Sequence, residues 1–200
     1  MKKIIGITGG IGSGKTTVAK HLASLGYRIY IADERAKAVM NENQALIKAL
    51  TDVFGEQTYL NGELNRPYIG NLIFQNKALL QQMNALVHPA VRADFHEWIE
   101  NTPADYPFQC VIREAAILFE ANVAQDCWKI MTVYAPKKVR LQRAVQRDAL
   151  SEADILKKMA NQWADLKKIQ ASDYVVINDG KYDWKNALEK QMQAWEGTAR

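Results

Sequence analysis

The chain has 200 residues, of which 48% are hydrophobic and 24% charged, enough for one compact domain with a sizeable core. No apolar stretch is long enough to cross a membrane, and glycines interrupt the N-terminal apolar run before a signal-type core could form. The net charge of +4 comes from residues 137–168, which hold nine basic and four acidic side chains, so a small anionic ligand is favoured over a long polyanion.

Strands and helices alternate along most of the chain. The predicted helices cover residues 15–25, 136–148, 151–162 and 182–195. Five apolar or β-branched runs are predicted as strands: Lys3–Thr8, Tyr27–Ala32, Phe108–Ile112, Trp128–Tyr134 and Tyr174–Ile177. This alternation predicts an α/β fold with a doubly wound, five-stranded parallel sheet.

Residues 35–102 show helical patterns and no convincing core strand, so we interpret them as a helical insertion. The patterns lie at 45–54, 69–74, 78–87 and 91–99. The predicted organisation is a single domain over residues 1–200. It has a core at about 1–34, 103–137 and 166–200, the insertion at about 35–102, and a helical lid at about 138–165.

A glycine-rich loop follows the first predicted strand and matches the pattern G-x-x-x-x-G-K-[ST]. Such a loop can surround phosphates with its backbone N–H groups, at the positive end of the helix that follows. Lys15 can reach the β- and γ-phosphates, and the Thr16 hydroxyl can ligate Mg²⁺. The predicted ATP-binding residues in this loop are Gly9, Gly10, Ile11, Gly12, Ser13, Gly14, Lys15, Thr16 and Thr17.

Asp33 follows the second predicted strand, at the sheet edge where ligands bind in such folds. A carboxylate there could accept the proton of an attacking hydroxyl, as phosphoryl transfer to an alcohol requires. It could equally be the N-cap of a helix that begins at Glu34. No N-K-x-D signature accompanies the loop, so a GTPase switch is not favoured.

Arg140, Arg143 and Arg147 share one face of a predicted helix. Their guanidinium groups suit the charge of a phosphoryl group in transfer. The other interpretation is a solvated basic face.

Together these residues resemble the dephospho-CoA kinase family over nearly the whole chain. The similar segments are Gly6–Val18, Ala32-Asp33, Leu64-Asn65-Arg66, Ile73-Phe74, His88-Pro89-x-Val91-Arg92, Leu118-Phe119-Glu120, Arg143-x-x-x-Arg147-Asp148, Gln162, Asp173-Tyr174-Val175 and Asn178-Asp179-Gly180. The chain departs from the family at Ile31, where an aspartate is common, and at Ala116, where a proline is common.

The resemblance implies a P-loop kinase fold and transfer of the ATP γ-phosphoryl group to the ribose 3′-hydroxyl of dephospho-CoA. In that reaction Asp33 would be the general base, and Lys15 with Arg143 or Arg147 would neutralise developing charge. The adenine would lie near Arg147, Asn178 and Gly180. The acceptor would contact Asp33, Arg66, His88 and Arg92, although His88-Pro89 could also be a structural turn at a helix boundary. Mg²⁺ would be held at Thr16.

We expect a cytoplasmic enzyme, a monomer or weak homo-oligomer, that acts on small molecules and binds neither nucleic acid nor membrane. Cys110 and Cys127, 17 positions apart and outside any CxxC pair, fit reduced thiols in that compartment. Two alternatives stay open: a kinase of another small molecule, and an ATP-dependent module that uses the basic window to bind nucleic acid.

Overall fold

The structure is a computed structural model that describes residues 2–197, apart from the side chain of Gln75. The chain divides into two compact units. The first consists of Met1–Ile31 and Ala104–Arg200, and the second of Ala32–Pro103.

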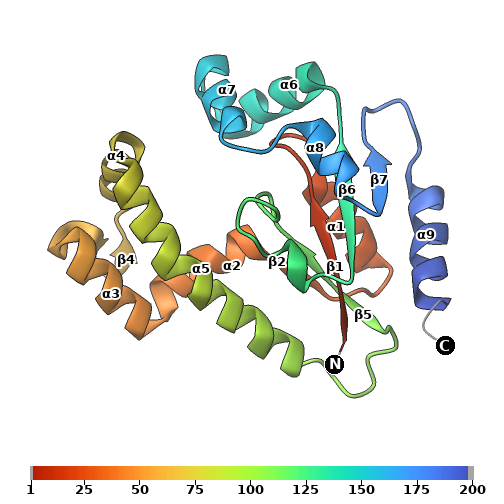
Figure 1. Ribbon diagram of the computed structural model, residues 1–200, viewed down its shortest axis with the longest axis horizontal. Helices are drawn as coiled ribbons and strands as arrows, with labels where there is room; N and C mark the ends of the chain where they lie inside the picture. The colour runs from red at the N-terminus through yellow and green to blue at the C-terminus, as the bar shows by residue number, and fades with distance from the viewer. Residues whose placement is uncertain (1, 198–200) are drawn as a thin grey trace. The chain divides into compact units, whose positions relative to one another are not determined.

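A five-stranded parallel sheet with strand order β2-β5-β1-β6-β7 forms the first unit (Figure 1). Its strands are β1 (Lys3–Thr8), β2 (Ile29–Ile31), β5 (Cys110–Glu114), β6 (Lys129–Tyr134) and β7 (Tyr174–Ile177). The predicted doubly wound sheet is therefore confirmed. After β1 the chain continues to β2 at one edge of the sheet, and after β6 it continues to β7 at the other edge. Ligands of such sheets bind beyond the carboxyl ends of the strands, at the point where the direction of the connections reverses.

The third core strand lies two residues later than predicted. β5 covers Cys110–Glu114 instead of Phe108–Ile112. The Phe108 ring stacks on that of Tyr27 with centroids 4.1 Å apart, outside the strand. At the other end, pairing with β1 continues through Glu114, which lies opposite Ile7. Polar residues thus extend the strand because the neighbouring backbone offers hydrogen bonds there.

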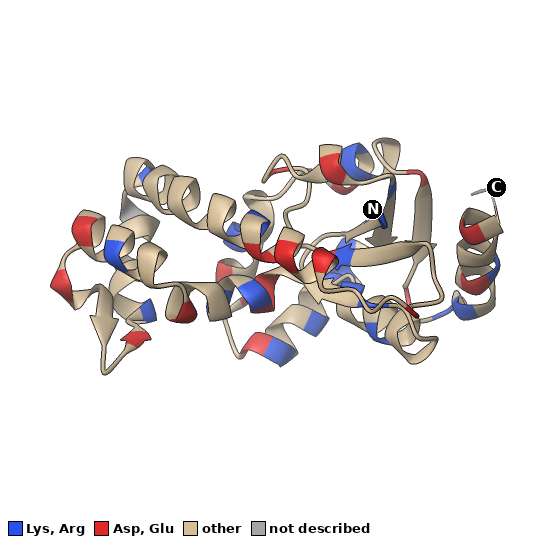
Figure 2. Cartoon of the chain, turned by 90° about the horizontal axis from the view of Figure 1, so that it is seen from below, with Lys and Arg blue, Asp and Glu red and all other residues tan. Residues whose placement is uncertain are grey.

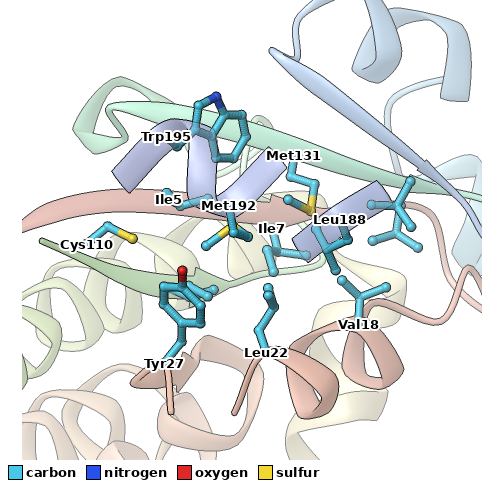
Figure 3. Packing of buried hydrophobic residues seen from close by; sticks show 13 residues of the cluster. Ile5, Ile7, Val18, Leu22, Tyr27, Cys110, Met131, Leu188, Met192 and Trp195 are labelled. Carbon is cyan, nitrogen blue, oxygen red and sulfur yellow. The ribbon is translucent and has the colours of Figure 1, made fainter. Parts of the chain in front are cut away.

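The helices α1 (Lys15–Ser24) and α9 (Lys185–Gly197) bury one apolar cluster against the sheet (Figure 3). Ile5 and Ile7 of β1 meet Leu22 of α1 and Met192 of α9 in this cluster, and all four side chains are at most 1% exposed. Burial of each such side chain stabilises the fold by about 1.5–3 kcal/mol. This packing fixes α1, and with it the loop that precedes α1, on the central strand.

Three helices and a short 3-10 turn complete the first unit: α6 (Lys137–Asp148), α7 (Glu152–Ala160), α8 (Asp165–Gln170) and η2 (Ala124–Asp126). The first two helices agree with prediction, but α8 was not predicted. It has only six residues, and Leu166 is 65% exposed, so it lacks a periodic apolar face. Its position depends on tertiary contacts such as the ion pair between the fully buried Lys168 and Glu120.

The second unit is mainly helical. It consists of α2 (Ala32–Glu42), α3 (Gln44–Phe54), η1 (Glu56–Thr58), β3 (Tyr59–Leu60), β4 (Glu63–Leu64), α4 (Arg66–Gln75) and α5 (Lys77–Glu100). The small β3–β4 hairpin was not predicted. Asn61 and Gly62 both have positive φ, 52° and 84°, and the pair Asn-Gly is a strong signal for a tight hairpin turn.

The prediction of two helices at 78–87 and 91–99 was wrong, because α5 runs without interruption from Lys77 to Glu100. Pro89 lies inside it and removes one helical hydrogen bond. The buried side chains Val87, Val91, Phe95 and Ile99 continue at a spacing of four across the proline, and their packing holds the helix together. Among the described residues, no helix is both long and apolar enough to span a membrane.

Cys110 and Cys127 are free thiols. Burial and a hydrogen bond to the Glu196 carboxylate raise the pKa of Cys110 well above its usual value, and burial raises the pKa of Cys127 to about 12. Because the thiolate is the reactive species, we expect iodoacetamide at pH 8 to label neither cysteine in the native protein and both in denaturant. Peptide mass spectrometry measures this, and rapid native labelling of either thiol would contradict it.

Candidate active site

The predicted phosphate loop, Gly9–Thr17, covers the connection from β1 to α1 and the first residues of α1, at the carboxyl end of the central strand. Gly12 has φ of 78°, and Gly14, the N-cap of α1, has φ of 90°, which glycine adopts without strain. The Ser13 N–H donates to the Gly10 carbonyl oxygen at 3.0 Å and closes a turn. The loop therefore ends where the first backbone N–H groups of α1 are exposed at its positive end.

The loop glycines also allow other backbone and side-chain groups to approach closely. A Cβ atom at Gly12 would lie closer than 3.0 Å to the carbonyl oxygen of Arg140 on α6. One at Gly14 would lie closer than 3.0 Å to the side-chain amide of Asn178, which follows β7. Elements far apart in the sequence thus pack directly on the loop, and only glycine leaves room for them.

The chemical groups around the loop fit a phosphate. The hydroxyls of Thr8 and Ser13 are buried without a hydrogen-bond partner among the described residues. Lys15, the first residue of α1, is 9% exposed, whereas Thr16 and Thr17 are exposed. The buried Lys15 and the two hydroxyls that lack a hydrogen-bond partner lie beside a glycine-rich turn at a helix N-terminus. This combination suits an anionic ligand with several acceptor oxygens.

Arg140 supports the loop rather than facing solvent. It is 6% exposed, and its guanidinium donates to the carbonyl oxygens of Ile11 at 3.3 Å and Ala135 at 3.1 Å. It also forms an ion pair with Asp165. The interpretation of the three arginines as a solvated basic face is therefore wrong for Arg140.

The other two arginines of α6 have different surroundings. Arg143 donates to the Asn178 carbonyl oxygen at 2.9 Å, and the Asn178 side chain donates to the Ser13 carbonyl oxygen at 2.8 Å. Gly180, with φ of 86°, follows two residues later. Arg147 is exposed and forms its ion pair with the next residue in the chain. The structure therefore links Arg143 and Asn178 to the phosphate loop and leaves Arg147 further along α6.

The basic window of residues 137–168 is partly neutralised by ion pairs. Arg140, Arg147, Lys157 and Lys168 each have an acidic partner. Basic and acidic residues are interspersed along the helices (Figure 2). These ion pairs interrupt the basic charge, whereas binding of a long polyanion is favoured by a continuous basic surface.

Glu114 was not predicted as a site residue. It is the last residue of β5, is 3% exposed, and lies opposite Ile7 of β1, at the sheet edge where the phosphate loop begins. The signal in the sequence is an acidic residue two positions after the apolar run Cys110–Ile112, where a parallel strand ends. Gln162 and Asp165 were also not predicted as site residues, because their partners lie far away in the sequence. Gln162 contacts the loop at Ile11, and Asp165 pairs with Arg140, which contacts the loop in turn.

The remaining predicted residues lie in the second unit. Asp33 is the second residue of α2 and is exposed. Because α2 begins at Ala32, Asp33 lies within the first turn, and its interpretation as the N-cap of a helix from Glu34 is wrong. It still carries negative charge at the positive end of a helix, which is favourable.

The predicted acceptor residues lie on two helices of the same unit. Arg66 is the first residue of α4 and is exposed. His88 and Arg92 lie four residues apart within α5 and therefore on the same helix face. The interpretation of His88-Pro89 as a turn at a helix boundary is wrong, because both residues lie inside α5. Within the described part of the chain, no group of three or more His, Cys, Asp or Glu residues is arranged to hold a metal ion.

A sequence model of a protein family described as dephospho-CoA kinase matches residues 3–183. The dephospho-CoA kinase of Bacteroides fragilis is 36% identical over 177 residues, covering 88% of this chain and 85% of that protein. That of Porphyromonas gingivalis is 38% identical over 175 residues, covering 87% and 85%. That of Chlorobium chlorochromatii is 35% identical over 198 residues, covering 96% and 92%.

Solved structures share the fold of this chain. TT1252 from Thermus thermophilus aligns with a TM-score of 0.85 and 30% identity, covering 97% of each chain. A dephospho-CoA kinase from Campylobacter jejuni aligns with a TM-score of 0.71 and 24% identity over 100% of each chain. A shikimate kinase from Acinetobacter baumannii aligns with a TM-score of 0.53 and 16% identity, covering 100% of this chain and 96% of that chain, and shows likeness of fold alone.

Proposed function

The chain belongs to the dephospho-CoA kinase family, and from this membership we propose that it transfers the γ-phosphoryl group of ATP to the ribose 3′-hydroxyl of dephospho-CoA. The products are ADP and coenzyme A, and the reaction is the last step of coenzyme A synthesis. The observation that carries the proposal is the phosphate loop, with its buried Lys15 and unpartnered Ser13 hydroxyl, inside a chain that the family matches from residue 3 to residue 183.

The ATP phosphates lie on Gly12–Thr17 in this proposal. Lys15 would extend to the β- and γ-phosphates, and the exposed Thr16 hydroxyl would hold Mg²⁺. When bound, Mg²⁺ supplies positive charge that offsets the charge of the phosphates. The adenine lies near Arg147 and the segment 178–180, because Asn178 is already bonded to the loop through Ser13.

The arginines of α6 act on the transferred group. Arg140 places the start of α6 against the loop, and Arg143 follows one turn later on the same face. Arg143 or Arg147 neutralises the charge that develops on the γ-phosphoryl group, and α6 with α7 forms the lid that excludes water. Without that exclusion, water would compete with the acceptor for the phosphoryl group.

Asp33 takes the proton of the acceptor hydroxyl. The 3′-oxygen of the acceptor forms a bond to the γ-phosphorus as the bond between that phosphorus and the ADP oxygen breaks. The hydroxyl proton passes to the Asp33 carboxylate. Covalent geometry supports this position, because Asp33 follows Ile31, the last residue of β2, by two residues, which span about 7 Å at most.

The acceptor binds to the second unit through Arg66, His88 and Arg92. His88 and Arg92 share one face of α5, and guanidinium groups bind phosphate in bidentate geometry. Dephospho-CoA carries a diphosphate, so a pair of cationic side chains one helical turn apart suits it. Glycerol- or shikimate-like acceptors lack that group.

A coupled ADP-release assay with ATP and Mg²⁺ tests the proposal. It compares dephospho-CoA with a panel of nucleoside monophosphates and shikimate-like alcohols. We expect ADP release with dephospho-CoA to exceed that with any other acceptor by at least about 100-fold in kcat/KM. Turnover of a different acceptor would contradict the proposed substrate, and RNA binding without acceptor-dependent release would favour the nucleic-acid module.

A further inference from the structure

The segment Gln162–Lys168 covers the end of the α7–α8 connection and the first residues of α8. Its contacts with two other parts of the first unit are not explained by the proposed chemistry. One is the phosphate loop at Ile11. The other is the segment 116–120 after β5. The Gln162 and Leu118-Phe119-Glu120 motifs of the sequence therefore meet in space.

The Gln162 side chain joins both parts. Its Oε1 accepts the Ile11 N–H at 2.9 Å, and its Nε2 donates to the Ala116 carbonyl oxygen at 3.2 Å. Both partners have fixed roles, one a donor and the other an acceptor. A neutral side chain of this length satisfies both only if it carries an acceptor and a donor on the same terminal group, which the glutamine amide provides. If the amide were turned over, its NH₂ group would face the Ile11 N–H and its oxygen would face the Ala116 carbonyl oxygen, and neither hydrogen bond could form.

The segment that carries Gln162 is itself firmly held. Glu120 Oε1 accepts the Trp163 N–H at 2.7 Å and pairs with Lys168 Nζ at 2.9 Å. Lys168 is fully buried, and its Nζ also donates to the Ala116 carbonyl oxygen at 3.1 Å. The rings of Phe119 and Trp163 stack with centroids 5.1 Å apart and planes 5° apart. Gln162 thus projects from a rigid base, which a positioning role requires.

Both backbone polar groups of Ile11 are held, and they belong to two successive peptide groups. Gln162 binds its N–H, and Arg140, through its ion pair with Asp165, binds its carbonyl oxygen. Ile11 directly precedes Gly12, where the part of the loop that receives the phosphates begins. Gln162 thereby fixes the Gly10–Ile11 peptide, and Arg140 fixes the Ile11–Gly12 peptide, which carries the Gly12 N–H. Together they orient the backbone that leads into the phosphate-binding part of the loop.

We propose that Gln162 is a positioning residue for the phosphate loop, which it holds in its nucleotide-binding conformation through the Ile11 N–H. The proposal rests on the proposed function only in taking ATP as the ligand of this loop. Gln162 touches neither substrate. Its loss weakens nucleotide binding because the loop then samples other conformations before it binds.

Gln162→Met tests this inference, because methionine has similar length and volume but neither hydrogen bond. Direct titration with ADP and Mg²⁺ needs no acceptor, so it is independent of the dephospho-CoA assignment. We expect the Kd for ADP to rise about tenfold, as loss of one or two hydrogen bonds allows. We also expect the KM for dephospho-CoA to stay within about twofold, and amide hydrogen exchange at Ile11 to become faster.

The matched control is Gln170→Met, since Gln170 is an exposed residue at the end of α8. Its Kd for ADP should equal that of the wild type. Unchanged ADP affinity in Gln162→Met would overturn the proposal. The proposal would also be overturned if ADP affinity and thermal stability fell together while the KM for dephospho-CoA rose, because that pattern indicates general damage to the fold. Weaker ADP binding in a protein that does not phosphorylate dephospho-CoA would support the positioning role and reject only the proposed substrate.

Discussion

Replacement of Asp33 by asparagine is expected to lower kcat by a factor on the order of 10²–10⁴, the usual contribution of a general base. Asparagine has the same shape and can still orient a hydroxyl, but it cannot take its proton. The affinity for ADP should not change, because the proposed role of Asp33 concerns the acceptor. Single-turnover kinetics with saturating ATP and dephospho-CoA, together with ADP titration, measure the two quantities.

Glu34→Gln is the matched control for this substitution. Glu34 is the next residue of α2 and is also exposed. Its replacement by glutamine removes the same charge from the same helix turn. The kcat of Glu34→Gln should stay within about fivefold of the wild type, since a change in the helix-end charge alone is worth only about 0.3–1 kcal/mol. A loss of less than tenfold in Asp33→Asn, or an equal loss in both variants, would reject Asp33 as the base.

Gly12→Ala should abolish useful nucleotide binding, with at least about a 100-fold rise in the Kd for ADP. The new Cβ atom would lie closer than 3.0 Å to the Arg140 carbonyl oxygen, a backbone atom of α6 that cannot rotate away. Either α6 or the loop must shift, and a misplacement of about 1 Å at a phosphate site can cost two orders of magnitude. Titration calorimetry with ADP and Mg²⁺ measures the effect.

Gly62→Ala is the control for the general loss of fold stability that an alanine at positive φ causes. Gly62 has φ of 84°, close to the 78° of Gly12, but a Cβ atom there would meet nothing within 4 Å. Both variants carry the left-handed strain of about 1–2 kcal/mol. Only Gly12→Ala should lose ADP affinity. An ADP affinity in Gly12→Ala close to that in Gly62→Ala would show that contact with α6 does not shape the loop.

The sequence alone determined the features that depend on local pattern. The phosphate loop could be predicted because glycines, a lysine and a threonine occur at fixed spacing between a strand and a helix. The five core strands were readable because each is a short apolar run, and their alternation with helices allows few topologies. Family membership followed from the same local motifs, read in order along the chain.

Other features were ambiguous in the sequence because competing local signals had similar strength. Pro89 predicted a break in α5, yet the buried series from Val87 to Ile99 continues the helix across it. The hexapeptide of α8 has no apolar period, so its conformation depends on the burial of Lys168 beside Glu120. In both cases tertiary packing outweighs local preference.

Only the tertiary structure decided how the three arginines of α6 differ. Helical spacing placed Arg140, Arg143 and Arg147 on one face, but their partners come from distant segments. Arg140 binds the phosphate loop and Asp165, Arg143 binds the carbonyl after β7, and Arg147 pairs with its neighbour. The contacts of Gln162 with Ile11 and Ala116 span 151 and 46 positions of sequence. Spacing along one helix cannot encode such partners, because they are chosen when separate elements pack around the same loop.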